Sequence, residues 1–180
     1  MATTTQQEIP TGTWQADSVH SHVGFAVKHM VVSTFRGRFE DYEARLSTEG
    51  GEPRLIGVVR TESIVVKDEN LAAHLRSPDF FDVERHPEMR FVSTSIRREG
   101  DRLLVAGDLT LKGHTHRVEG EGTIVEPTDD AFGGTRLGLE LEAVIDRTAF
   151  GLEWNAPLPK GGFALANDVK LGLDLEFVRV

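Results

Sequence analysis

The sequence predicts an all-β fold in which an antiparallel sheet buries one apolar face, and two observations support this class. Apolar and polar residues alternate with a period of two along most of the chain, most clearly in VKLGLDLEF at residues 169–177. Such alternation is typical of strands with one buried face. Glycines also lie inside the alternating segments, where they are tolerated at bends. They favour a closed barrel over a sandwich, and they are Gly57, Gly107, Gly120, Gly122, Gly138 and Gly172.

The first predicted strands lie between residues 23 and 66. In residues 23–27 the apolar side chains occupy the odd positions. In residues 35–46 they change from odd to even positions, which predicts a β-bulge near Glu40. Residues 55–66 form a long β-branched run, in which the pattern does not decide which side is buried.

One stretch has helical spacing, DENLAAHLRSPDFF at residues 68–81. Leu71 and Leu75 are four residues apart, and Pro78 ends the turn. The paired Phe80 and Phe81 follow directly. We expect this segment to cap one end of the barrel as a lid over its interior.

The second half of the chain contains five more alternating segments, at residues 89–91, 103–111, 118–124, 137–145 and 169–177. A short turn is expected at residues 147–152. Together with the first half this gives about eight strands joined by short connections rich in Gly, Pro and Asp. The sequence therefore predicts one antiparallel sheet that closes on itself.

Composition limits the domain organisation and the compartment. The chain has 180 residues, enough for a single core, and we expect residues 1–12 to be a disordered lead and residues 13–180 to be one domain. The amino terminus carries no basic segment followed by an apolar run, so a cytoplasmic location is expected. No apolar stretch approaches the ~20 residues that span a bilayer, so no stable membrane insertion is expected.

Charge and cysteine content exclude several functions. Lysine and arginine number 20 against 29 acidic residues, which gives a net charge of −9. This balance argues against nucleic acid as a partner, since binding to phosphates needs a basic surface. The absence of cysteine excludes thiol catalysis, cysteine-ligated zinc and iron–sulfur clusters.

No standard catalytic motif occurs, so we expect no catalytic residues and a protein that is not an enzyme. The alternative is a β-barrel metalloenzyme built from two His-x-His pairs. His20 with His22, and His114 with His116, each place two imidazoles on one face of a strand, and His29 lies nearby in the sequence. The other interpretation is that these histidines form hydrogen-bonded corners or lie on the solvent face.

Basic residues cluster at predicted strand ends. The clusters either line an opening that holds a polar or anionic head group, or form an ordinary charged surface. Asp146 and Arg147 form an adjacent acid and base after an apolar strand, a pattern typical of a solvated turn or a local ion pair. The clustered residues are Lys28, His29, Arg36 and Arg38, and Lys112, His114, His116 and Arg117.

Several ordered motifs resemble the YceI-like family, the polyisoprenoid-binding proteins of bacteria. The similarity covers most of the chain, beginning with Trp14, Asp17 and HSHVGFAVKHMVVSTFRGRF. It continues through HLRSPDFFDVERHPEMRFVST, GDLTLKGHT and IDRTAFGL to DVKLGLDLEFV. One departure is Ala72, where family members often carry an acidic residue two positions before the histidine.

The resemblance implies an eight-stranded antiparallel lipocalin-like β-barrel with one short helix as a cap. It also implies a small-molecule lipid partner, an isoprenoid quinone or polyprenyl chain, held inside the barrel for carriage, storage or sequestration. No cofactor other than this bound lipid and no metal ligand is expected. Family members are often dimers, so the resemblance implies a homodimer.

Inward-facing apolar residues are expected to contact the lipid. Small residues on the inner face, Gly107, Gly120 and Gly122, are expected to leave the space that a chain needs. The head-group candidates are His29, Lys112, His114 and Arg147. A filled-core interaction module remains a further alternative. The expected lipid contacts are Val23, Phe25, Val27, Phe39, Leu75, Phe80, Phe81, Phe91, Leu109, Leu139, Leu141, Phe150, Leu171 and Leu173.

Overall fold

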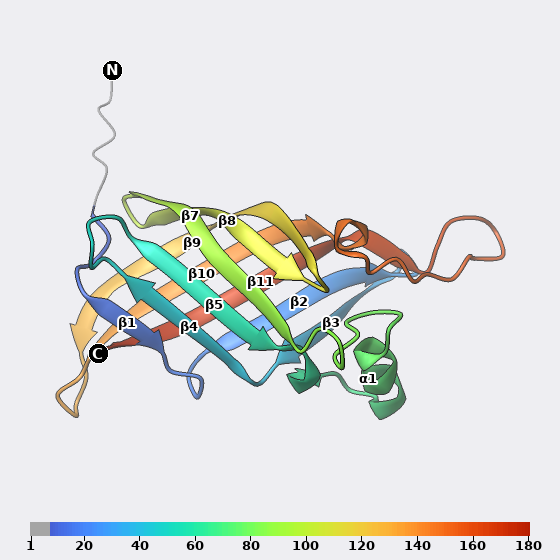
Figure 1. Ribbon diagram of the computed structural model, residues 1–180, viewed down its shortest axis with the longest axis horizontal. Coiled ribbons are helices and arrows are strands. Elements are labelled where there is room, and N and C mark those ends of the chain that lie inside the picture. Colours follow the sequence, from blue (N-terminus) through green and yellow to red (C-terminus); the bar gives the residue numbers. More distant parts are fainter. Residues whose placement is uncertain (1–7) are drawn as a thin grey trace, which may run out of the picture.

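The computed structural model describes residues 8–180 and consists mainly of one strongly twisted antiparallel sheet (Figure 1). One α-helix, α1 Glu69–Arg76, and two short 3-10 helices, η1 Thr61–Ser63 and η2 Arg147–Phe150, accompany it. The strands are β1 Thr13–Ala16, β2 His22–His29, β3 Ser33–Phe39, β4 Tyr42–Ser47, β5 Arg54–Arg60, β6 Ile64–Val65, β7 Glu88–Glu99, β8 Arg102–Leu111, β9 His114–Asp129, β10 Thr135–Asp146 and β11 Leu165–Arg179.

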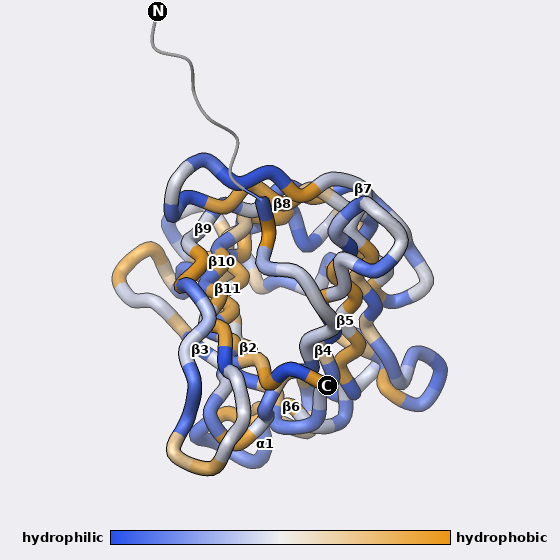
Figure 2. Tube along the Cα trace, turned by 90° about the vertical axis from the view of Figure 1, so that its left-hand side faces the viewer, coloured by the Kyte–Doolittle hydropathy of each residue, from blue (hydrophilic) through white to orange (hydrophobic). Residues whose placement is uncertain are grey.

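The strands form a closed ring when viewed along the barrel (Figure 2). Neighbours pair in the order β1, β4, β5, β7, β8, β9, β10 and β11, and β1 also pairs with β11. Three of the barrel strands consist of two segments each. On the side toward α1, β2 takes the place of β1 and β3 takes the place of β4. There β6 takes the place of β5, because it pairs with β3. The predicted eight-stranded antiparallel barrel is therefore confirmed, with three of its strands interrupted.

The change of apolar positions near Glu40 marks a strand break, and the predicted β-bulge is wrong. Glu40 and Asp41 form a bend between β3 and β4, which pair with different strands. The Glu40 amide donates to the Ser63 carbonyl at 3.3 Å, and the Arg60 amide donates to the Asp41 carbonyl at 2.9 Å. The chain turns here from one part of the sheet to another without inserting an extra residue into a ladder.

The predicted helix is present as α1. It begins after Asp68, whose carboxylate accepts a hydrogen bond from the Leu71 amide at 2.8 Å, the usual role of an N-cap aspartate. It ends at Arg76, two residues before Pro78. Arg76 Nη2 donates to the Ile64 carbonyl at 3.2 Å and so ties α1 to β6. Within residues 8–180, no helix combines the length and apolar character needed to cross a membrane.

The apolar core occupies the end of the barrel that holds β1 and the carboxyl terminus, called here the closed end. Trp14 and Phe177 are almost completely buried there. Ile9 packs against the same core, and the Gly12 amide donates to Thr48 Oγ1 at 2.8 Å. This packing differs from the disordered lead expected for residues 1–12, of which residues 1–7 lie outside the described part of the chain.

Candidate functional site

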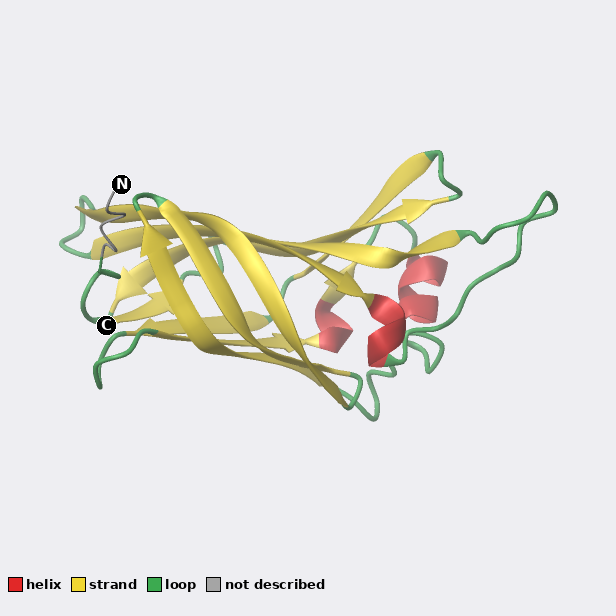
Figure 3. Cartoon of the chain, turned by 90° about the horizontal axis from the view of Figure 1, so that it is seen from above, coloured by secondary structure: helices red, strands yellow, loops and turns green. Residues whose placement is uncertain are grey.

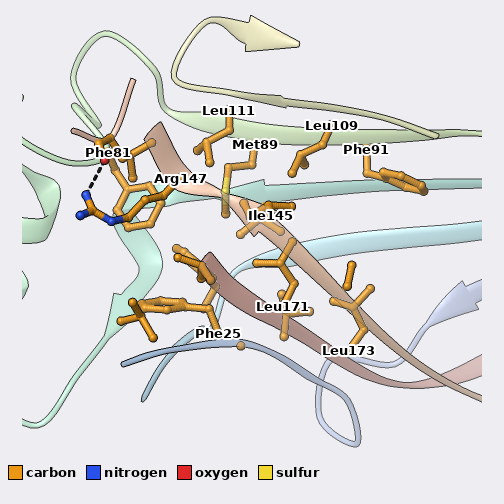
Figure 4. Close-up of a pocket in the computed structure, with 18 of the residues that line it drawn as sticks. Phe25, Phe81, Met89, Phe91, Leu109, Leu111, Ile145, Arg147, Leu171 and Leu173 are labelled. Carbon is orange, nitrogen blue, oxygen red and sulfur yellow. Dashed lines mark hydrogen bonds between the residues drawn. The ribbon is translucent and has the colours of Figure 1, made fainter. Parts of the chain in front are cut away.

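A cavity of about 620 Å³ lies inside the barrel between the closed end and α1, the helix end. Figure 4 shows apolar side chains from several strands pointing into it. Phe91, Leu171 and Leu173 lie inside the barrel yet are only half-buried, because they face the cavity instead of other side chains. A largely apolar cavity of this size matches the range of about 300–1,000 Å³ that is typical of small-molecule sites.

Twelve of the fourteen residues expected to contact a lipid line this cavity. Leu139 and Phe150 do not. Leu139 faces inward like Leu141, but it lies within the packed closed-end core. Phe150 lies in η2, where its ring packs edge-on against His116 with centroids 5.0 Å apart. The lining members of the expected set are Val23, Phe25, Val27, Phe39, Leu75, Phe80, Phe81, Phe91, Leu109, Leu141, Leu171 and Leu173.

Inward-facing glycines do not all leave open space. A Cβ on Gly107 would lie 2.4 Å from the Val92 carbonyl and 2.5 Å from the Phe91 ring. A Cβ on Gly122 would collide with the Glu140 carbonyl at 1.8 Å. Both glycines therefore allow close approach of neighbouring groups. Gly57 is the open position, because it lines the cavity and the nearest heavy atom to its Cβ would be 3.9 Å away.

Aromatic side chains form the cap at the helix end. The His74 ring packs edge-on against Phe80 and Trp154, with centroids 5.0 and 4.8 Å apart. Phe81 packs edge-on against Phe39 at 5.6 Å, which anchors the segment after α1 to the barrel wall. All five residues line the cavity, so the cap belongs to its wall.

Arg147 is the buried cation of the cavity wall. Its Nε donates to the Ala166 carbonyl at 2.8 Å, and its Nη1 donates to the carbonyls of Leu152 at 2.5 Å and Trp154 at 2.9 Å. Nη2 is buried and has no hydrogen-bond partner among residues 8–180. Burial lowers the pKa of the guanidinium below its usual value, and the neighbouring Asp146 opposes this.

The expected solvated turn at Asp146 and Arg147 is wrong, because Arg147 is only 4% exposed. Asp146 instead caps η2, accepting from the Thr148 amide at 2.9 Å and from its hydroxyl at 2.6 Å. These two hydrogen bonds lower the pKa of Asp146.

The four head-group candidates divide into two groups. His29 and Arg147 line the cavity near the helix end. Lys112 and His114 do not line it. Lys112 Nζ donates to the carbonyls of Pro78 at 2.6 Å and Gly151 at 3.2 Å, so it ties the cap to the β8–β9 turn from outside.

The His-x-His pairs do not converge on a metal site. Among the described residues, one group of three potential ligands has atoms within 4.8 Å of one another, namely Asp17, His20 and Glu176. Arg136 already occupies it, since its Nη1 donates to Asp17 Oδ2 at 3.0 Å and to Glu176 Oε1. The carboxylates there neutralise a guanidinium. His116 Nε2 lies 2.9 Å from the Ala149 carbonyl, as in the corner interpretation.

Sequence reasoning missed several lining residues. Leu111, Ile145 and Val169 lie on the same alternating pattern as the expected set, so extending the pattern to the strand ends would have found them. Met89 faces the cavity from the start of β7 in the same way. Trp154 lies in the irregular segment between η2 and β11, where no periodicity could indicate its position.

Solved structures share this architecture. The crystal structure of BcnA from Burkholderia cenocepacia aligns with a TM-score of 0.75 and 21% identity, covering 89% of this chain and 98% of that one. A polyisoprenoid-binding domain from Saccharophagus degradans aligns with a TM-score of 0.69 and 12% identity, covering 95% of this chain and all of that domain (100%). At these identities the likeness concerns the fold.

Sequence relatives are closer. Protein YceI from Escherichia coli O157:H7 is 33% identical over 137 residues, which cover 74% of this chain and 72% of the relative. A UPF0312 protein from Staphylococcus epidermidis is 33% identical over 168 residues, covering 89% and 94%. The family model for the YceI-like domain matches residues 14–177. The chain therefore belongs to the YceI-like family.

Proposed function

We propose that this protein binds a long-chain amphiphilic lipid, an isoprenoid quinone or a polyprenyl chain, inside its barrel. The observation that carries the proposal is the elongated apolar cavity, which is closed by packed side chains at one end and bordered by the aromatic cap at the other. Membership of the family and the structural likeness to a polyisoprenoid-binding domain support it. The role would be carriage, storage or sequestration, without catalysis.

Burial of the chain supplies the affinity. Each buried CH₂ contributes ~0.8 kcal/mol, so about twenty buried carbons contribute on the order of 16 kcal/mol before costs. Ordering the chain and immobilising the ligand offset a large part of this gain. The apolar residues of the wall, such as Phe25, Leu109 and Leu171, would make these contacts.

The polar head group would lie at the helix end, where Arg147 provides hydrogen-bond donors. A buried donor without a partner is costly, and a ligand oxygen next to Nη2 would remove that cost. A quinone carbonyl and a phosphate oxygen are both suitable acceptors. Figure 4 shows Arg147 at one end of the row of apolar side chains, which fits a head group there and a chain running toward Leu173.

Organic extraction of the purified protein followed by mass spectrometry tests this function. We expect about one lipid per chain, whose mass identifies the tail and head group. Protein without bound lipid is then titrated with a quinone that carries a prenyl tail. Absence of lipid together with failure to bind this quinone would contradict the proposal.

A matched pair of variants tests the cavity itself. Gly57→Leu places a side chain in the open space, and we expect it to lower the bound lipid at least tenfold. Gly172→Leu makes the same change on the outer face, because Gly172 alternates with the inward Leu171 and Leu173 and has no atom near its Cβ. It should retain lipid. Full lipid content in a folded Gly57→Leu protein would contradict the cavity as the binding site.

The expected homodimer and cytoplasmic location remain predictions. Light scattering at several protein concentrations measures the first, and fractionation of cells that express the natural gene measures the second.

A further inference from the structure

Four exposed apolar side chains form a patch beyond the helix end, called here the rim patch: Met30, Val31, Val32 and Phe163. Val31 is 83% exposed, Val32 86% and Phe163 61%. The first three form the turn between β2 and β3, and Phe163 lies in the loop before β11. The Met30 amide donates to the Ala164 carbonyl at 2.7 Å, so the turn and the loop lie side by side.

The backbone conformation of this turn is one that methionine and valine rarely adopt. Met30 and Val31 have φ angles of 54° and 64°, in the left-handed region where turns usually place Asn or Gly. A β-branched residue such as Val31 is uncommon there because its Cβ crowds the backbone. Such an outlier in a solvent-exposed position points to a function that requires the apolar side chain.

Cations without acidic partners surround the rim patch. Lys28 and Arg36 flank the turn and Lys160 lies in the loop, and none of the three forms an ion pair with another residue of the described chain. Residues 28–38 and 155–167 contain no acidic residue, although the protein as a whole has a net charge of −9. The two segments that carry the rim patch are therefore locally positive.

The rim patch borders the cavity. His29 and Ser33 flank the turn, Ala164 follows Phe163, and all three line the cavity. Figures 1 and 3 show the loop before β11 extending past α1, which makes it the outermost part of this end. The helix α1, which carries one acidic residue, Glu69, lies behind the tip of that loop.

We propose that the rim patch docks the protein on an anionic phospholipid bilayer, with the helix end facing the membrane. The apolar side chains would enter the boundary between head groups and acyl chains, while Lys28 and Lys160 contact lipid phosphates. Contact is peripheral and reversible, since four side chains on two loops bury little area. A lipid that moves between the bilayer and the cavity would then cross only a short distance through water.

A second copy of this chain is a poorer occupant of the rim patch. A stable dimer needs about 800 Å² from each partner, more than two narrow loops offer. A two-fold interface would also bring Lys28 and Lys160 close to the same cations of the other copy, which costs free energy. A bilayer with negative head groups satisfies both the apolar and the charged residues.

Sedimentation with vesicles tests the docking. We expect the protein to bind vesicles of phosphatidylcholine mixed with phosphatidylglycerol, and to bind phosphatidylcholine vesicles much less. The double variant Val31→Asn, Val32→Ser should lower the partition coefficient roughly tenfold or more, because both apolar contacts are lost. It should also fold well, since asparagine suits the left-handed position. Replacing Lys28 and Lys160 by Gln should lower binding about fivefold for each charge and reduce its dependence on salt.

Phe132→Ser is the matched control. Phe132 is 94% exposed but lies in the loop between β9 and β10, at the closed end and next to Asp129 and Asp130. We expect this variant to bind vesicles like the wild type. Wild-type protein that does not bind the mixed vesicles would overturn the proposal, as would equal binding by the valine variant or a rim-dependent dimer seen by light scattering.

The docking proposal and the proposed lipid binding are tested by separate measurements, so either can be contradicted without the other. Vesicle binding is measured on protein extracted free of lipid, whereas lipid content is measured on the native protein without vesicles. A rim variant that loses vesicle binding but keeps its bound lipid supports docking as a distinct property.

Discussion

The two ends of the barrel are built from the same alternating strands, yet one is filled and the other is hollow. At the closed end, Trp14, Leu139 and Phe177 pack against one another and are at most 2% exposed. Toward the helix end, the same inward positions of β10 and β11 border a cavity. Alternation determines which face of a strand is buried, while the side chains across the barrel determine whether that face meets protein or open space.

The ends also differ in how polar groups are used. At the closed end, Arg136 joins Asp17, Asp130 and Glu176 in one half-buried network of ion pairs. At the helix end, Arg147 is buried and donates to backbone carbonyls, and its Nη2 has no partner in the described part of the chain. The polar groups at the closed end therefore stabilise the fold, whereas those at the helix end have the features of a binding site.

The sharpest test of this comparison is one substitution made at both ends. Leu139→Ala removes a fully packed side chain, so we expect it to lower the free energy of unfolding by about 2–5 kcal/mol. Leu173→Ala enlarges an existing cavity and loses fewer contacts, so we expect a loss of about 1–2 kcal/mol. Urea unfolding of lipid-free protein measures both values.

A larger cost at Leu173 than at Leu139 would contradict the division into a filled and a hollow end. The ligand provides a second check. Bound lipid should stabilise the wild type and the Leu139→Ala variant by similar increments, because ligand binds only the folded state and Leu139 does not line the cavity.

The next effect in size is expected at Arg147. Arg147→Met keeps much of the volume but leaves the carbonyls of Leu152, Trp154 and Ala166 without their donors. Because unsatisfied buried acceptors are costly, we expect a loss of about 2–3 kcal/mol in urea unfolding and a weaker preference for ligands with an acceptor head group. Unchanged discrimination between a prenyl quinone and a hydrocarbon of equal length would refute a head-group role for Arg147.

Sequence alone predicted much of the fold, for physical reasons. A period of two requires strands, and the long one-sided segments require a sheet that closes, so residues 103–111, 137–145 and 169–177 were all located correctly. The break at Glu40 was misread because a bulge and a strand break change the alternation in the same way. Only the pairing partners of β3 and β4 distinguish the two cases.

The alternation along the strands predicted which residues of the candidate site face the barrel interior. It did not predict how far along the barrel the cavity extends. Leu139 and Leu141 share one pattern, but only Leu141 reaches the cavity. Gly107 and Gly57 are the same residue in similar strands, yet a neighbouring ring covers Gly107 and leaves Gly57 open. Such differences arise from tertiary contacts, which no local pattern records.

The smallest expected effect is the pH dependence of the closed-end network. Hydrogen bonds from His20 and Arg136 lower the pKa of Asp17 to about 2, and hydrogen bonds from Arg136 and two backbone amides lower that of Asp130 to about 2. Both values lie below the usual 3.8, so the unfolded chain binds protons first as the pH falls. This stabilisation is present above about pH 4 and is lost toward about pH 2.

His20 contributes in the opposite direction. The carboxylate of Asp17 raises the pKa of His20, so its contribution is complete below the ordinary value of 6.5 and is lost as the pH rises through the raised value. Arg136→Gln should flatten the acid limb of a plot of melting temperature against pH, because the pKa values of Asp17 and Asp130 return toward normal. The limb above neutral pH should persist, since the pairing of His20 with Asp17 remains. An acid limb as steep as that of the wild type would show that Arg136 does not control these carboxylates, and that the seal at the closed end rests on apolar packing alone.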